Sequence, residues 1–149
     1  MPWSRKKERE IVFQMLFASL FFPEEKTPDL YQTLLEGTDE TEAKDSAYIQ
    51  TAFCGARDYA DQAKEKIALA AKGWKIERFS KTTLAILLLA LYEMDCMEEI
   101  SEKVAINEAV ELAKKFDDDA APKFINGILD KLAQKLRPND PVRPTKATA

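Results

Sequence analysis

The amino-acid sequence predicts an all-α protein, a compact bundle of about six to seven helices. Apolar residues recur at the 3.6-residue spacing of an amphipathic helix along most of the chain, and no stretch has the alternation of a strand. The segment 84–91 is apolar on every side, which suits a helix at the centre of a bundle and is too short to span a bilayer. A chain of 149 residues can form one core, so a single domain is expected.

The first two helices are expected in the N-terminal quarter of the chain. Ser4 suits the N-cap of a helix that runs to about Phe22, where Pro23 and acidic residues stop it. A second helix begins at or near Asp29, and residues 37–43 form a polar loop. The apolar face of this second helix contains Leu30, Leu34 and Leu35.

A long third helix is expected from about Asp45 to Lys72, because its apolar residues keep a single helical period. Gly73 is well placed to end it, and Trp74 begins a short connector. Ser80 can then cap the central apolar helix. The apolar positions of the long helix are Ile49, Ala52, Phe53, Ala56, Ala60, Ala63, Ile67 and Ala70.

Residues 101–136 predict a C-terminal helical hairpin. Ser101 is a suitable N-cap for its first helix, and Asp119 is a candidate cap for its second, which Arg137-Pro138 closes. Gly127 lies inside the second helix, where it costs about 1 kcal/mol relative to Ala, so close approach of a neighbouring helix is expected there. Apolar stripes at helical spacing occupy Ile106, Ala109, Val110, Ala113 and Phe116 in one helix, and Phe124, Ile125, Ile128, Leu129, Leu132 and Leu136 in the other.

The domain is expected to span residues 1–138, followed by a flexible, proline-rich tail at 139–149. The first 22 residues lack the order of basic, apolar and small residues that marks a signal peptide, so a cytoplasmic location is expected. The net charge of −4 is unevenly distributed. Residues 1–16 and 137–149 each carry +2, which leaves −8 in between and predicts an acidic body with basic ends.

Four cations lie in the first turns of the first helix: Arg5, Lys6, Lys7 and Arg9. The helix dipole disfavours positive charge at this end, although two nearby glutamates offset part of the cost. Such a cluster is either an ordinary solvated helix start or a contact for an RNA backbone. If all four neutralise phosphates of one strand, log affinity falls against log salt with a slope of roughly −3.

Two segments of the hairpin resemble a known family. Residues 104–114 have the sequence VAINEAVELAK and residues 123–130 have KFINGILD, which closely match the wording of the NusB family of bacterial transcription antitermination factors. Other landmarks follow in the same order as in that family: the basic first helix, Trp74 with Arg78, and the segment 89–93, LALYE. The resemblance covers roughly residues 4–138.

The resemblance implies both a function and partners. NusB proteins bind the boxA element of single-stranded leader RNA together with NusE, a small-subunit ribosomal protein, and with other Nus factors they help RNA polymerase to pass termination signals in ribosomal RNA operons. No cofactor is implied. The RNA-binding role of the family's arginine-rich first helix falls here on Arg5, Lys6, Lys7 and Arg9. Lysine lacks the planar fork that arginine uses for stacking and bidentate contacts, so base recognition by the two lysines is in question.

Family members use aromatic positions to bind NusE, and these match Phe17, Phe116 and Phe124 here, although burial in the core is an equal alternative for each. The acidic partner contact of some members aligns near Ala120, so Asp119 or Asp118 is expected to replace it. The family's paired Asp and Arg in the central helix are Thr83 and Leu88 in this chain. Some members form homodimers and others are monomers, and a homodimer remains possible here.

An enzyme is not expected. The chain has no histidine, no phosphate-binding or nucleophile motif, and two cysteines without metal-ligand spacing. The acidic run Asp117-Asp118-Asp119 lacks the spaced oxygen ligands of a calcium loop, so no metal site is expected. The remaining alternative is a helical module that binds only protein, or a second copy of itself, without RNA.

Overall fold

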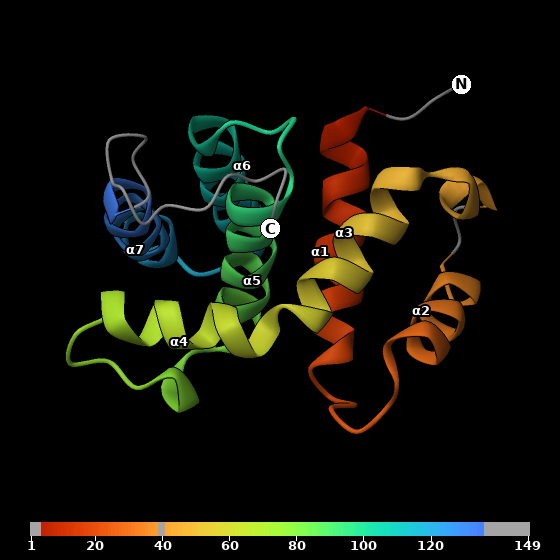
Figure 1. The fold of residues 1–149 in the computed structure, drawn as a ribbon, viewed down its shortest axis with the longest axis horizontal. Helices are drawn as coiled ribbons and strands as arrows, with labels where there is room; N and C mark the ends of the chain where they lie inside the picture. Colours follow the sequence, from red (N-terminus) through yellow and green to blue (C-terminus); the bar gives the residue numbers. More distant parts are fainter. Residues whose placement is uncertain (1–3, 39–40, 136–149) are drawn as a thin grey trace.

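The computed structural model describes residues 4–38 and 41–135, and in this part of the chain it contains seven α-helices, two short 3₁₀ helices and no strand (Figure 1). The all-α prediction is therefore confirmed. The elements are α1 (Arg5–Ser19), α2 (Thr27–Glu36), η1 (Thr41–Asp45), α3 (Ala47–Asp58), α4 (Ala60–Ala70), η2 (Ile76–Arg78), α5 (Lys81–Cys96), α6 (Glu102–Phe116) and α7 (Ala121–Lys135).

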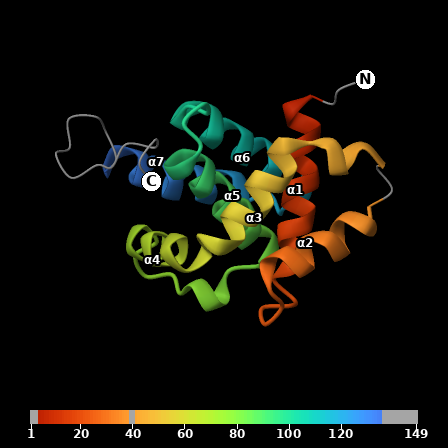
Figure 2. The ribbon, with the colours of Figure 1, turned by 45° about the vertical axis from the view of Figure 1, so that its right-hand side comes forward.

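Helix α5 is the centre of the bundle, as its apolar sequence predicts. It contacts α1, α3, α4, α6 and α7, and every residue from Ala85 to Leu91 is buried. In Figure 1 α1, α2 and α3 lie on one side of α5, while α6 and α7 pair on the other. Figure 2 shows the same bundle turned by 45°. A helix without a polar face is stable in water only when neighbours cover it on all sides, which this arrangement provides.

Serine caps fix the starts of four helices. Ser4, Ser46, Ser80 and Ser101 each accept a hydrogen bond at 3.0 to 3.1 Å from the backbone N–H three residues later. These bonds satisfy donors that the first turn of a helix leaves without partners. The caps at Ser4, Ser80 and Ser101 confirm the predicted helix starts. The cap at Ser46 was not predicted.

The prediction of one long third helix is wrong, because the chain bends at Tyr59 and forms α3 and α4 instead (Figure 1). Tyr59 has φ −86° and ψ −3°, outside the regular helix, and its hydroxyl lies 2.5 Å from Oδ2 of Asp95 on α5. The bend lets α3 pack against α1 and α2, and α4 against α5 and α7. Since both halves face the same core, their apolar residues keep one period across the bend.

Two helix ends differ slightly from the prediction. α1 ends at Ser19 rather than Phe22, because the N–H groups of Phe21 and Phe22 bond to carbonyls only three residues back and tighten the chain into a turn. α4 ends at Ala70, and Gly73 follows with φ +84°, a left-handed conformation that glycine adopts without strain. Gly73 thus reverses the chain shortly after the helix.

The expectation for Gly127 is wrong. Gly127 is exposed, and a Cβ atom added to it would meet nothing within 4 Å. The close approach occurs at Gly55 instead, where an added Cβ would lie 2.1 Å from the ring of Tyr92. The Tyr92 ring can therefore lie against α3 in this position because residue 55 has no side chain.

The start of α7 also differs from the prediction. Asp118, not Asp119, accepts hydrogen bonds from the N–H groups of Ala120 and Ala121, both at 3.0 Å. Arg137-Pro138 and the predicted tail at 139–149 lie outside the described residues. Among the described residues no helix has both the length and the apolar character that crossing a membrane requires.

Candidate nucleic-acid interface

The start of α1 presents three exposed cations, Arg5, Lys6 and Lys7. Nε of Arg5 lies 3.3 Å from Oε1 of Glu8, and the Arg5 guanidinium lies 4.2 Å from the centre of the Tyr48 ring. An arginine that stacks on an aromatic ring has fewer conformations to lose when it binds an anion. Nζ of Lys6 is 4.0 Å from a carboxylate oxygen of Glu108, a weak contact at an exposed site.

Arg9 does not belong to this exposed cluster, which corrects the expectation of four cations on one open turn. Its side chain is only 4% exposed and binds Glu93 of α5 in a fork: Nε and Nη2 each lie 2.9 Å from Oε2. Nη1 lies 3.4 Å from Glu108, and the Tyr48 hydroxyl donates to the same Glu93 oxygen at 2.7 Å. Buried charges require this degree of pairing, so Arg9 fastens α1 to the core.

The ionisation of this cluster follows from its burial. Burial raises the pKa of Glu93, whereas the Arg9 guanidinium and the Tyr48 hydrogen bond act in the opposite direction. Burial disfavours the charge of Arg9, but Glu93 and Tyr48 together outweigh it and raise the Arg9 pKa. The pKa of Tyr48 is also raised, first by burial and then by Glu93, so its hydroxyl keeps the proton that it donates. Arg9 therefore remains a cation that is already neutralised from within.

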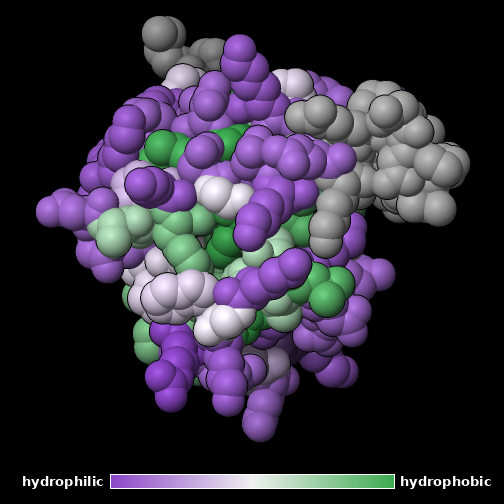
Figure 3. Space-filling model, turned by 90° about the vertical axis from the view of Figure 1, so that its left-hand side faces the viewer, coloured by the Kyte–Doolittle hydropathy of each residue, from purple (hydrophilic) through white to green (hydrophobic). Residues whose placement is uncertain are grey.

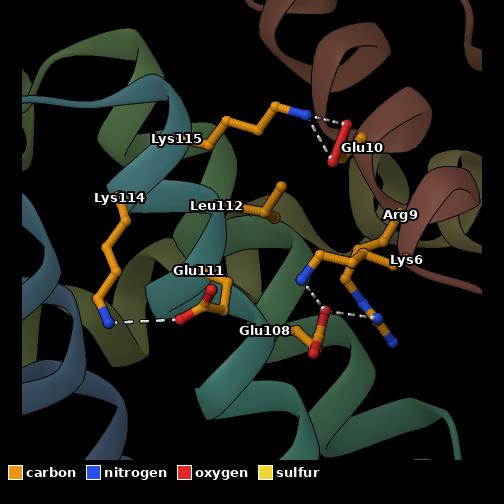
Figure 4. Close-up of a pocket in the computed structure, with 8 residues that line it drawn as sticks. All are labelled: Lys6, Arg9, Glu10, Glu108, Glu111, Leu112, Lys114 and Lys115. Carbon is orange, nitrogen blue, oxygen red and sulfur yellow. Dashed lines mark hydrogen bonds and ion pairs between the residues drawn. The ribbon is translucent and has the colours of Figure 1, made fainter.

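A groove of about 240 Å³ separates the start of α1 from α6 (Figure 4). Lys115 reaches across it and lies 2.8 Å from Oε1 of Glu10, while Lys114 lies 3.4 Å from Glu111 on its own helix. Leu112 lies between these polar groups (Figure 4). The groove adds two exposed lysines near Lys6, but carboxylates accompany all of them.

The aromatic residues predicted to bind a protein partner lie in two separate places. Phe17 is half-buried on α1 and packs edge-on against Phe21, with ring centres 5.4 Å apart. Phe116 is half-buried and lies 5.0 Å from Phe13, one turn before Phe17. Phe17 and Phe116 thus flank the same end of the contact between α1 and α6, and both combine core packing with partial exposure.

Phe124 lies in a different aromatic cluster. Its ring is 5.3 Å from Phe79 and 5.7 Å from Trp74, both in the segment between α4 and α5. Asp119 is exposed in the turn between α6 and α7. Phe124 and Phe116 therefore belong to the same helical hairpin, but among the described residues their rings contact different partners.

Sequence analysis did not anticipate Tyr48 and Glu93 as neighbours of the basic cluster. Glu93 carried a usable signal, because it is an acidic residue beside the apolar core segment of α5 and needs a buried cation. Tyr48 carried none. Thr83 and Leu88 occupy the positions of the family's paired acid and arginine. The Thr83 hydroxyl donates to Asp117 at 2.6 Å, and Leu88 is buried in the core.

Within the described ranges, no three acidic or cysteine side chains gather in a way that could hold a metal ion. Cys54 and Cys96 do not form a disulfide with each other. The arrangement has exposed cations, partly exposed aromatic rings and a fixed scaffold, which are the components of a binding surface.

Known proteins resemble this chain in scaffold and in sequence. A model of the NusB family matches residues 6–134. The transcription antitermination protein NusB of Limosilactobacillus fermentum is 40% identical over 131 residues, which cover 87% of this chain and 92% of that protein. The NusB protein of Clostridium novyi is 37% identical over 127 residues, covering 85% of this chain and 95% of that protein.

Solved structures agree in fold. The structure of T. maritima NusB superimposes with a TM-score of 0.79 at 32% identity, covering 91% of this chain and 94% of that one. A chain in the crystal structure of a plectonemic RNA supercoil shares the fold with a TM-score of 0.69 at 24% identity. The chain belongs to the NusB family.

Proposed function

We propose that this chain is a transcription antitermination factor that binds boxA-type single-stranded leader RNA of ribosomal RNA operons together with the ribosomal protein NusE. In this role it promotes processive elongation by RNA polymerase. Its membership of the NusB family supports the proposal, because its relatives over nearly the whole chain are transcription antitermination proteins. RNA and NusE themselves are inferred from the surface and from the family resemblance.

The exposed first turn of α1 is the observation that supports RNA binding. Arg5, Lys6 and Lys7 project from a helix start that Arg9 and Glu93 fasten to the core. The proposal assigns phosphate contacts to Arg5, Lys6 and Lys7 and an anchoring role to Arg9. With three phosphates in place of four, the start of α1 contributes roughly −2 to the slope of log affinity against log salt.

The NusE contact is assigned to Phe17 and Phe116, with Phe124 and Asp119 at a second position along the hairpin. Phe21 is 55% exposed beside Phe17 and enlarges the apolar area at the end of α1. Partly buried aromatic anchors with one open edge are favoured at protein interfaces, because a partner can complete their burial. Asp119 offers a charge at the rim in place of Ala120.

The test is the affinity of the protein for a boxA-like RNA, measured by fluorescence anisotropy with and without NusE. Binding that is tighter in the ternary mixture supports an adaptor for RNA and protein. Binding to NusE without any affinity for RNA, alone or in the mixture, would instead support the module that binds only protein. Sedimentation velocity on the same samples decides between monomer and dimer.

A further inference from the structure

A second surface stands out in the connector between α4 and α5. Trp74 is 63% exposed, although tryptophan is mostly buried in folded proteins. Three exposed cations surround it in sequence, Lys72, Lys75 and Arg78, with Glu77 as the only acid between residues 72 and 78. We call Lys72, Trp74, Lys75 and Arg78 the connector surface.

Trp74 is held in place rather than loosely displayed. Gly73 turns the chain with φ +84°, and the Trp74 N–H donates to the carbonyl of Ala71 at 2.9 Å. The indole and the Phe124 ring form a T-shaped pair, with a ring-centre distance of 5.7 Å and an interplanar angle of 66°, and Phe124 also packs against Phe79. The ring is therefore oriented on one side and open on the other.

The cations of the connector surface differ from those of α1 in their neighbours. Arg5 and Lys6 each have a carboxylate within 4.0 Å. In the described part of the chain, Lys72, Lys75 and Arg78 have no such ion pair. On the face that carries α4 and α7, hydrophobic surface is bordered by hydrophilic side chains (Figure 3). Cations that form no ion pair can bind an anion without first breaking one.

We propose that the connector surface is a second contact for single-stranded RNA, in which a base stacks on Trp74 while Lys72, Lys75 and Arg78 bind the flanking phosphates. Cations interleaved with an open aromatic face are the arrangement that binds single strands without sequence readout. The site is separate from the start of α1, because the two lie at opposite ends of the molecule in both ribbon views (Figures 1 and 2).

This inference rests on the proposed function, since it extends the path of the same RNA. An acidic protein segment is the competing occupant. RNA is favoured because a base can stack on the exposed indole while the phosphates on either side bind the three separate cations. An acidic segment would pair with the cations but would leave the indole without a stacking partner.

Trp74 can report its own occupancy. The chain has two tryptophans, so in Trp3→Phe the emission of Trp74 is observed alone. We expect that a boxA-like single-stranded RNA quenches this emission in the presence of NusE, at the concentrations at which anisotropy shows binding. NusE without RNA sets the baseline of this emission, because Phe124, which packs against Trp74, belongs to the assigned NusE contact.

Two sets of variants complete the test. Trp74→Leu should weaken RNA binding by about fivefold or more, while Trp74→Phe, which keeps an aromatic face, should retain most of it. Lys72→Gln with Lys75→Gln should make the salt slope shallower by about 1.4. The matched control, Lys44→Gln with Lys103→Gln, removes the same charge from exposed sites elsewhere and should leave the slope unchanged. Circular dichroism verifies that each variant keeps its helices.

The outcomes separate the two proposals. RNA binding that leaves Trp74 emission and the Lys72 and Lys75 salt slope unaffected would overturn the connector surface alone. Quenching that NusE without RNA produces in full, and that RNA does not deepen, would assign the surface to protein and also overturn it. Absence of RNA binding in any mixture would overturn the proposed function itself.

Discussion

Arg5 and Arg9 lie one turn apart on the same helix and have different roles. Arg5 is exposed and stacks on Tyr48, whereas Arg9 is enclosed and forks onto Glu93. Sequence alone could place both on α1 and could not separate them, because Glu93 is 84 residues away and the burial of Arg9 depends on how α1 meets α5. The difference divides the basic cluster into exposed cations and one buried, paired arginine.

Arg9 can be tested through stability. Arg9→Met should lower the free energy of unfolding by about 3–5 kcal/mol, because it leaves the Glu93 carboxylate buried without its cation. The control, Arg5→Met, should change it by less than about 1 kcal/mol, since its ion pair is exposed. Urea denaturation followed by circular dichroism measures both. Equal effects of the two substitutions would contradict the assignment of Arg9 as anchor.

The two helical glycines make a matched pair. Gly127→Ala should raise the free energy of unfolding by about 1 kcal/mol, because the added methyl group meets open space and alanine favours the helix. Gly55→Ala should lower it by about 1–3 kcal/mol, because Tyr92 must move away from the new methyl group. Thermal unfolding of both variants decides, and a stabilised Gly55→Ala would show that α3 and α5 do not pack as described.

At the scale of elements, the central helix and the hairpin were predictable because their signals are local: an all-apolar segment, serine caps and periodic stripes. The division into α3 and α4 was not. Its cause is the tertiary contact of Tyr59 with Asp95 and Lys66, at 2.5 and 2.9 Å, while the apolar period continues through the bend. The apolar period shows which side of a helix is buried. It does not show where the helix axis changes direction while that side stays buried.

The Tyr59 hydroxyl at the bend between α3 and α4 has a titration that can be measured. Burial, with the hydrogen bond to Asp95, raises the pKa of Tyr59 to about 12, from about 10 for a free tyrosine. Since folding favours the neutral phenol, this contribution to stability is complete below about pH 10 and is lost as the pH rises towards 12. Alkaline absorbance titration near 295 nm should therefore lose a component near pH 12 in Tyr59→Phe. A component near pH 10 lost in its place would contradict the contact.

The start of α7 separates stability from partner binding. Asp118→Ala should cost about 1 kcal/mol of stability, because it removes the acceptor for the N–H groups of Ala120 and Ala121. Asp119→Ala should leave the free energy of unfolding within about 0.5 kcal/mol of wild type and weaken NusE binding. Denaturation and titration calorimetry on both variants check the division. Stability lost at Asp119 and kept at Asp118 would restore the cap predicted from the sequence.

At the scale of the whole molecule, sequence predicted the family, the all-α class and the basic first turn, because each is written in contiguous residues. It did not predict which cations face solvent or which aromatic rings meet. Phe116 packs beside α1 while Phe124 joins Trp74 and Phe79, and this division arises from the angle at which the hairpin meets α5. The acidic body therefore carries separate basic regions at the start of α1 and in the connector.

Arg5, Lys6 and Lys7 at the start of α1 are proposed to bind the RNA backbone. The direct measurement is the salt dependence of affinity for a boxA-like RNA with NusE present, in wild type and in Arg5→Gln with Lys6→Gln, between about 50 and 200 mM salt. The control is Lys44→Gln with Lys103→Gln, which removes the same charge elsewhere.

The α1 variant should bind more weakly, and its slope of log affinity against log salt should be shallower by about 1.4, because two phosphate contacts are lost. The control should keep the wild-type slope. An α1 variant with the affinity and slope of wild type would contradict the claim and move the RNA contact away from α1.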